Sequence, residues 1–194
     1  MTLALPEPRL EQGATVHRFN RREYYRMGQS GLFDGRRVQL IDGQIIDMAP
    51  QNYRHAATVE RLNRLMVRGF GDKFRVRPQL PVLIDSNSEP EPDIAVVPGS
   101  AGQEKDHPRT ASLVIEVSDT TLRLDRRKAA LYASIKVPEY WIVNLVADCV
   151  EVYRGPVRGD DGWRYDSIRV AGKGETISPL AKPRVKMRVA SLLA

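Results

Sequence analysis

The chain has 194 residues, of which 42% are hydrophobic and 28% charged, a balance that excludes a disordered chain or fibrous repeat and suits one domain with a single core. Its net charge of +6 favours an acidic partner such as nucleic acid, because basic side chains release the counterions condensed on a polynucleotide. The single cysteine, Cys149, excludes an internal disulfide, and no apolar run reaches the roughly 18 residues of a membrane helix, so we expect a reducing, cytoplasmic location.

The N-terminal segment predicts a loose arm followed by a short helix. Residues 1–19 are rich in Pro and Glu, and we expect them to form a flexible arm before a single domain over residues 20–194. Asn20 has the position of a helix N-cap, with Glu23 at the capping-box position and Gly28 at the end of the helix.

A hairpin and a long helix are expected next. Residues 38–48 hold two apolar runs around Asp42-Gly43, which is a strong signal for a β-hairpin. A helix is predicted over about residues 53–70, because apolar residues recur there at helical spacing and arginines fall on another face. The apolar positions are Val59, Leu62, Met66 and Phe70, and the arginines are Arg54, Arg61, Arg64 and Arg68. Such a basic face either contacts the phosphates of a nucleic acid or is simply solvated.

The remainder of the chain predicts a sheet interrupted by one helix. Strands are expected at residues 74–84, 93–97, 113–117 and 140–145, and a closing hairpin at 149–153 and 163–170. A second helix is predicted over about residues 122–136, with Asp119 and Thr120 as its caps. This order of helices and strands predicts an α/β or α+β fold.

Two acidic residues stand in runs that should be buried strands. Asp93 opens the run Pro-Asp-Ile-Ala-Val-Val, and Glu116 stands within Leu-Val-Ile-Glu-Val-Ser. If these strands pair antiparallel about a midpoint between Glu104 and Lys105, Asp93 lies opposite Glu116. Two buried carboxylates repel, so a divalent cation between them would offset the cost, and oxygen ligands suit Mg²⁺ or Mn²⁺. For Asp93 alone, the structural alternative is an acceptor in a turn.

Lys128 adds a cationic group to these acids. On the predicted second helix it shares one stripe with Leu124, Leu131 and Ile135, so its ammonium is expected to point at the sheet. There it could orient a water molecule or stabilise charge on a phosphate. The structural alternatives are a salt bridge to Asp125 or an ammonium that extends to the rim.

Four segments together resemble one nuclease family. They are Pro-Asp before an apolar strand, Leu-Val-Ile-Glu-Val-Ser, Asp-Arg-Arg-Lys-Ala-Ala-Leu-Tyr-Ala, and Val-Pro-Glu-Tyr-Trp-Ile-Val. They resemble the Uma family of "putative restriction endonucleases", which is placed within the PD-(D/E)xK nuclease superfamily, and the likeness runs from the hairpin through His55 to Leu145. The resemblance implies a restriction-endonuclease-like core, in which a mixed central sheet is flanked by helices, with an extra N-terminal hairpin and a C-terminal β-hairpin.

The resemblance also implies a metal site. Asp93, Glu116 and the carbonyl of Val117 would bind the metal. The superfamily lysine two residues after the glutamate is Ser118 here, and its role is implied to move to Lys128. Gln39 stands where relatives have glutamate, and a neutral amide is a weaker metal ligand.

Three residues are candidates for auxiliary roles. His55, near the start of the long helix, is interpreted either as a group that positions water or as a cap or solvated residue. Glu91 shares a strand face with Asp93, although Pro90 and Pro92 favour an exposed segment over a ligand. Gln39 is the third.

The expected function is that of a Mg²⁺- or Mn²⁺-dependent endonuclease that hydrolyses phosphodiester bonds in DNA, with Asp93, Glu116 and Lys128 as catalytic residues. By analogy, a homodimer would serve to cut both strands. The alternative is a nucleic-acid-binding or interaction module of the same fold without useful catalysis, which Gln39 and Ser118 favour. A weaker option is a metal hydrolase of small phosphate esters.

Overall fold

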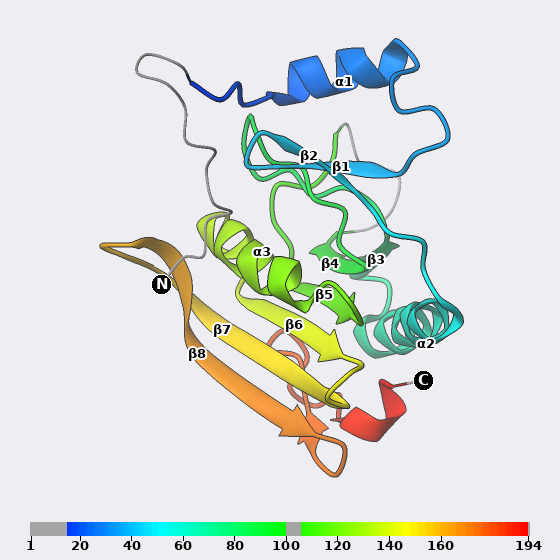
Figure 1. The fold of residues 1–194 in the computed structure, drawn as a ribbon. Helices are drawn as coiled ribbons and strands as arrows, with labels where there is room; N and C mark the ends of the chain where they lie inside the picture. The colour runs from blue at the N-terminus through cyan, green and yellow to red at the C-terminus, as the bar shows by residue number, and fades with distance from the viewer. Residues whose placement is uncertain (1–14, 100–105, 194) are drawn as a thin grey trace.

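The computed structural model describes residues 15–99 and 106–193, and there a twisted sheet is flanked by helices (Figure 1). The helices are α1 (Arg21–Gln29), α2 (Tyr53–Phe70), α3 (Leu122–Ser134) and the 3-10 helix η1 (Val189–Ser191). The strands are β1 (Val38–Ile41), β2 (Gln44–Asp47), β3 (Phe74–Pro78), β4 (Ile94–Pro98), β5 (Leu113–Ser118), β6 (Glu139–Asn144), β7 (Cys149–Gly159), β8 (Gly162–Gly172), β9 (Thr176–Ile177) and β10 (Met187–Arg188).

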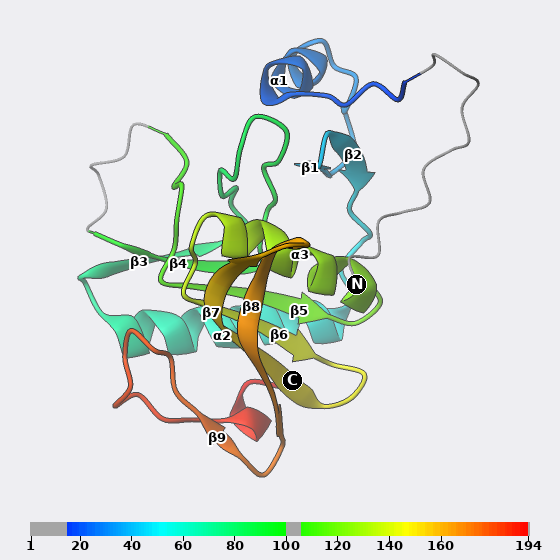
Figure 2. The ribbon, with the colours of Figure 1, turned by 90° about the vertical axis from the view of Figure 1, so that its left-hand side faces the viewer.

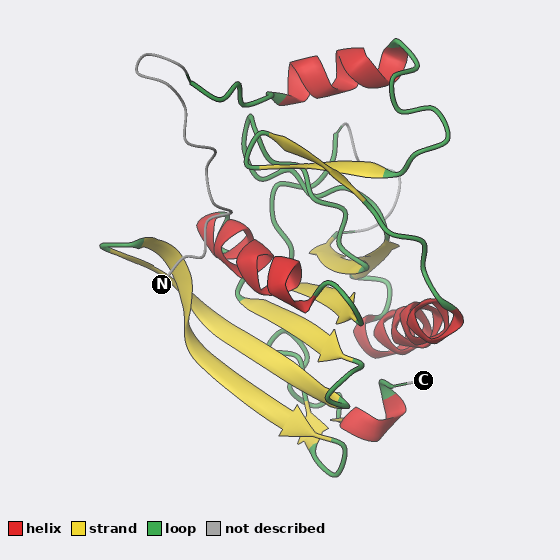
Figure 3. Cartoon of the chain, in the orientation of Figure 1, coloured by secondary structure: helices red, strands yellow, loops and turns green. Residues whose placement is uncertain are grey.

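The central sheet is mixed. Its six strands lie in the order β3-β4-β5-β6-β7-β8, and β1-β2 and β9-β10 form two small antiparallel sheets beside it. Within the central sheet only β5 and β6 run parallel, and α3 connects them, as a parallel pair requires. This arrangement confirms the predicted α+β class with a mixed central sheet, helices on its faces, an N-terminal hairpin and a C-terminal hairpin (Figure 3).

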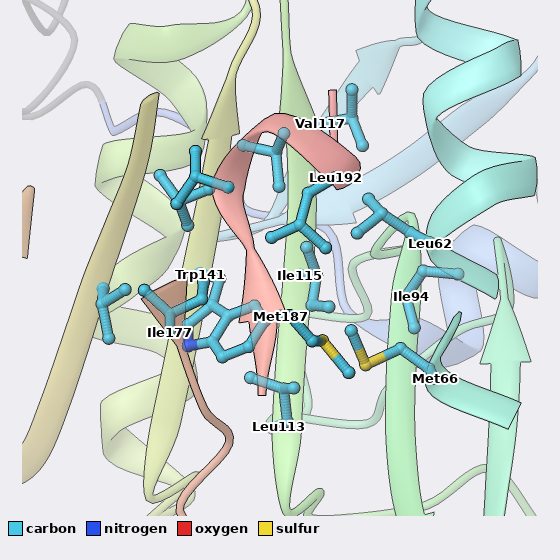
Figure 4. Packing of buried hydrophobic residues seen from close by; sticks show 14 of the residues in the cluster. Leu62, Met66, Ile94, Leu113, Ile115, Val117, Trp141, Ile177, Met187 and Leu192 are labelled. Carbon is cyan, nitrogen blue, oxygen red and sulfur yellow. The ribbon is translucent and has the colours of Figure 1, made fainter. Parts of the chain in front are cut away.

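The two faces of the sheet carry separate apolar cores. One core lies beneath α2 and the C-terminal segment, where Leu62 and Met66 pack against Ile94, Ile115 and the fully buried Trp141 (Figure 4). The other lies beneath α3, on the opposite face of the sheet (Figure 2). Strands β4, β5 and β6 are therefore covered on both faces, which explains their continuous apolar sequences.

Several predicted elements are confirmed. The Asn20 side chain accepts from the N–H of Glu23, and the Glu23 side chain accepts from the N–H of Asn20, so the capping box is present and α1 continues one residue past Gly28. The first hairpin turns at Asp42 and Gly43, whose φ values of 49° and 70° suit a tight two-residue turn. The long helix matches its predicted bounds, with its apolar stripe buried.

Other predictions are wrong in part. The strand expected over residues 74–84 ends at Pro78, because Gln79 takes a φ of 51° and the chain then leaves the sheet to contact the first hairpin. The caps predicted for α3 are also wrong. Thr121 is the N-cap and its side chain makes no capping bond, while Asp119 accepts a hydrogen bond from Asn52.

The buried face of α3 differs from the predicted stripe. Its buried residues are Asp125, Lys128, Ala129, Tyr132 and Ala133, whereas the leucines assigned to the stripe are only half-buried. Lys128 is buried as expected, but its neighbours on that face include a carboxyl and a phenol. The helix is therefore rotated toward polar partners that a hydrophobic period does not detect.

The N-terminal arm is described only from residue 15, and residues 1–14 of the predicted arm lie outside the described part. Residues 15–19 form neither helix nor strand, and the N–H of Phe19 donates to the carbonyl of Gly43 over 2.9 Å. No helix among the described residues is both long enough and apolar enough to cross a membrane.

Candidate metal centre

The register of β4 and β5 brings the two acids together. Ile94 pairs with Ile115 in the antiparallel ladder, so Asp93, one residue before β4, lies opposite Glu116. The N–H of Asp93 donates to Oε2 of Glu116 over 3.3 Å, and the N–H of Val117 donates to Oδ2 of Asp93 over 2.8 Å. The predicted antiparallel register is confirmed. Each acid is held by the backbone of the strand opposite.

Helix α3 supplies a cation and a phenol to the same carboxylate. Nζ of Lys128 lies 3.0 Å from Oε1 of Glu116, and the hydroxyl of Tyr132 donates to that oxygen over 2.9 Å. The Lys128 ammonium also lies 3.5 Å from Oδ1 of Asp125, whose other oxygen accepts from the Thr121 hydroxyl. The salt bridge weighed as a structural alternative for Lys128 therefore exists together with the contact to Glu116.

Tyr132 is a contact that the sequence reasoning missed. Its ring is fully buried. Its position four residues after Lys128 places both side chains on one helix face, so the signal was present in the spacing.

His55 lies on the other side of Asp93. The Asn52 side chain caps the start of α2 by accepting from the N–H of His55, and this places Nε2 of the ring 3.3 Å from Oδ2 of Asp93. The His55 side chain is only 15% exposed, so the structure excludes the interpretation of His55 as a solvated residue. Burial acts to lower the pKa of His55, but Asp93 and the backbone of Val117 outweigh it and raise the pKa, which favours an imidazolium beside Asp93.

Gln39 and Glu91 lie at the edge of the site. Oε1 of Gln39 accepts from the N–H of Glu91 over 3.3 Å, and the Glu91 carboxylate lies 3.5 Å from a guanidinium nitrogen of Arg37. Gln39 is buried and Glu91 is half-buried, so the prediction that Pro90 and Pro92 expose Glu91 is wrong in part. Ser118, at the position where the resemblance implies a lysine, is fully buried.

These residues surround an acidic cleft of about 220 Å³. Six carboxyls line the cleft, and they are Asp47, Glu91, Asp93, Glu116, Asp119 and Asp125. Lys128 and His55 are the basic groups among its lining residues. A cleft with this excess of acid attracts cations and repels the phosphates of a nucleic acid until that charge is offset.

Glu116 and Asp125, which both line the cleft, resist ionisation. Burial raises the pKa of Glu116 to about 8; Lys128 opposes this rise, and the charges of Asp125 and Asp93 add to it. Burial also raises the pKa of Asp125. For Lys128, burial acts to lower the pKa, but Glu116 and Asp125 outweigh it, so the lysine stays protonated. A further positive charge beside these acids would therefore be stabilising.

The donor set fits a hard divalent cation. Mg²⁺ commonly takes one or two carboxylates from the protein and completes its shell with water. Asp93, Glu116 and Val117 all line the cleft, so the Val117 carbonyl is the candidate backbone oxygen ligand. Among the described residues no group of three His, Cys, Asp or Glu side chains could hold a metal alone, so a carbonyl and water must contribute.

Comparisons with known proteins identify a solved structure of similar fold and a family whose sequence pattern matches the chain. A nuclease described as "putative" and belonging to DUF820, from Anabaena variabilis ATCC 29413, has a similar structure, with a TM-score of 0.70 and 13% identity over 90% of this chain and 97% of that chain. The type IIG restriction endonuclease BpuSI matches 52% of this chain and 11% of its own, with 15% identity and a TM-score of 0.36. A search of curated proteins finds no match. The sequence pattern of one family, Uma2, described as "Putative restriction endonuclease", matches residues 21–190. Since that match covers most of the chain, the protein belongs to the Uma2 family.

Proposed function

We propose that the protein is a metal-dependent endonuclease that hydrolyses phosphodiester bonds in DNA. The observation that carries the proposal is the pair of opposed carboxylates, Asp93 just before β4 and Glu116 on β5, with the Lys128 ammonium 3.0 Å from Glu116. Membership of a family described as restriction endonucleases supports the reaction class. The acidic cleft, together with the raised pKa of Glu116 within it, supports the dependence on Mg²⁺ or Mn²⁺.

In this proposal Asp93, Glu116 and the carbonyl of Val117 hold the metal. When bound, the metal would supply charge for the phosphate oxygens and lower the pKa of a water molecule. The protein's contribution is to fix the ligands. Hydrogen bonds from Val117 and Tyr132 hold the two carboxylates in place before any cation arrives, which reduces the ordering cost of binding.

Lys128 is proposed to act on the reacting groups. An ammonium has three N–H donors, of which one reaches Glu116 and another is directed at Asp125. The remaining donor is available for the attacking water or for a phosphate oxygen, and a positive charge fixed there stabilises the transition state. Lys128 thus takes the place of the lysine that is missing at Ser118.

The auxiliary residues are proposed to position others. His55 holds Asp93 by a charge-assisted contact, and Gln39 holds the backbone of Glu91. Two copies acting together would be needed for concerted cleavage of both strands, and this is part of the proposal by analogy only.

The test is cleavage of a supercoiled plasmid. Nicking is expected with Mg²⁺ or Mn²⁺ and not with EDTA, and Glu116→Gln and Asp93→Asn should abolish it. Glu139→Gln is the matched control, because Glu139 is another buried glutamate that pairs with a basic side chain, Arg154, outside the cleft. Cleavage that survives Glu116→Gln in a preparation free of contaminating nuclease would refute the mechanism.

A second candidate is a nucleic-acid-binding module that keeps the fold without catalysis. Ser118 in the lysine position and Gln39 in place of a glutamate favour it. It predicts salt-dependent DNA binding with no calorimetric signal for Mn²⁺. Mn²⁺ binding that is present in the natural protein and lost in Asp93→Ala would exclude this candidate.

A further inference from the structure

A larger groove lies on the other side of α3 from the acidic cleft. It occupies about 920 Å³ between α3 and the β7-β8 hairpin, two elements that lie side by side in Figures 1 and 2. Tyr153, Tyr165 and Ile168 contribute apolar lining from the sheet, and Trp163 stands at the start of β8. Ile168 is 60% exposed, so this part of the sheet is incompletely covered within the described residues.

The groove has basic walls, in contrast to the cleft. Arg123, Arg126 and Arg127 line it from α3, and Arg164 lines it from β8. Arg126 is paired with Glu151. Among residues 15–99 and 106–193, no ion pair or hydrogen bond engages the side chains of the other three. Asp160 and Asp161 are the acids of the lining, and both lie in the turn of the hairpin.

Guanidinium groups around an aromatic surface are the chemistry that binds a polynucleotide strand. Arginine pairs with phosphate through two parallel hydrogen bonds, and indole and phenol rings stack on bases. The tyrosine rings of the lining are buried and pack on one another, whereas Trp163 is only partly buried. An acidic peptide would satisfy the arginines but would leave the Trp163 ring without a planar partner. The combination therefore favours a strand that carries both phosphates and bases.

The position of the groove relates it to the cleft. Arg127 and Lys128 are consecutive residues of α3, one lining the groove and the other the cleft. A helix with its side chains is about 10–12 Å across, and about three nucleotides of a strand, at 3.4 Å of rise each, cover that distance. One strand crossing α3 could thus occupy both.

We propose that this groove binds the nucleic-acid strand that flanks the scissile phosphate, with phosphates on Arg123, Arg127 and Arg164 and a base on Trp163. The inference rests on the proposed nuclease function, because it assigns a place to the same substrate. It adds a binding surface whose charge is opposite to that of the catalytic cleft.

The first test uses tryptophan fluorescence. The chain has two tryptophans, and Trp141 is fully buried beneath the other face of the sheet, so Trp163 is the one that a ligand can reach. A 12-nucleotide single strand titrated into the protein in EDTA should quench the emission. The quenching should disappear in Trp163→Phe, which keeps an aromatic ring for folding and leaves Trp141 as the reporter.

The second test measures affinity against salt. Each phosphate contact to a single strand contributes a slope of about −0.7 in log K against log salt concentration. With affinities taken as equal at 1 M salt, the loss of one contact therefore lowers the affinity about eightfold at 50 mM salt and about threefold at 200 mM salt. Arg127→Ala and Arg164→Ala should each show those losses by fluorescence anisotropy. Arg68→Ala on the exposed face of α2 removes the same charge outside both cavities, and it should leave the slope unchanged.

Three results would overturn the inference. Equal losses in Arg68→Ala would show that binding follows net charge. A nucleoside monophosphate that quenches Trp163 as tightly as the 12-mer would identify a site for free nucleotide. Loss of dimers on sedimentation of Arg164→Ala, with strand affinity unchanged, would assign the surface to a second copy. These binding measurements need no metal, so they are independent of cleavage. Binding that depends on the arginines, in a protein that does not cleave DNA, would refute only the nuclease proposal. Cleavage by a protein whose strand binding does not depend on the arginines would refute only this inference.

Discussion

Replacement of Lys128 by methionine tests the buried centre of the site. Lys128 and Glu116 are each 4% exposed and lie 3.0 Å apart. Above the raised pKa of Glu116, where both groups are ionised, their attraction at an effective dielectric constant of about 20 is about 5 kcal/mol. Desolvation of both charges offsets much of this. Lys128→Met keeps an apolar side chain of similar length but leaves Glu116 and Asp125 without their cation, and removal of one partner of a buried pair costs about 3–5 kcal/mol.

The assay is unfolding in urea, followed by circular dichroism, on a double-mutant cycle. Lys128→Met should lower the free energy of unfolding by about 3–5 kcal/mol. The double variant Glu116→Gln, Lys128→Met should lose less than the sum of the two single variants, because both charges then leave together. Lys173→Met is the matched control, since that lysine lies 2.6 Å from Asp148 but is 58% exposed, and exposed pairs contribute about 0–1 kcal/mol.

A loss in Lys128→Met no larger than that in Lys173→Met would refute the reasoning. It would mean that water reaches the Lys128–Glu116 pair. The role proposed for Lys128, which requires a site from which water is excluded, would then be refuted. Additivity across the cycle would lead to the same conclusion, because it would show that the two side chains do not interact.

Three further predictions concern the Tyr132 hydrogen bond, binding of Mn²⁺, and the Glu151 ion pair. Tyr132→Phe removes a hydrogen bond to a carboxylate and should cost about 1.5–3 kcal/mol in the same unfolding assay; an unchanged stability would show that this bond contributes nothing. Mn²⁺ at 100 times its dissociation constant should stabilise the protein by about 2.7 kcal/mol, measured as a rise in melting temperature, and Glu116→Gln should show no rise. Burial acts to raise the pKa of Glu151, but Arg126 and Tyr153 outweigh it and lower the pKa, so its stabilisation is present above the unfolded pKa of about 4.3 and lost as pH falls through the lower folded pKa. Glu151→Gln should therefore weaken the dependence of stability on pH between about 5 and 3, and an identical acid profile would contradict this assignment.

The fold could be predicted where local rules and tertiary packing agree. The capping box of α1, the turn at Asp42-Gly43 and the apolar stripe of α2 are local signals, and each is found where expected. The opposition of Asp93 and Glu116 could be predicted because strand pairing is periodic. One residue of register determines every other pair in the ladder.

What could not be predicted depends on contacts distant in sequence. The rotation of α3 follows from Glu116, 12 residues before Lys128, and not from the apolar period of the helix itself. The ring of His55 faces Asp93 because the Asn52 cap sets the start of α2 and because α2 packs on the sheet. The departure of the chain from β3 depends on the left-handed φ of Gln79, a residue type that carries no strong signal for it.

The reciprocal bonds between β4 and β5 have a consequence for how this family can vary. The N–H of Asp93 donates to the Glu116 carboxylate, and the Asp93 carboxylate accepts from the N–H of Val117. An inserted or deleted residue within either strand would therefore turn one acid to the opposite face of the sheet. A change of length between the strands would leave the pairing intact. Insertions should therefore be tolerated between Pro98 and Leu113 and selected against inside the strands. A scan of single-residue insertions and deletions with a folding reporter would reveal this pattern.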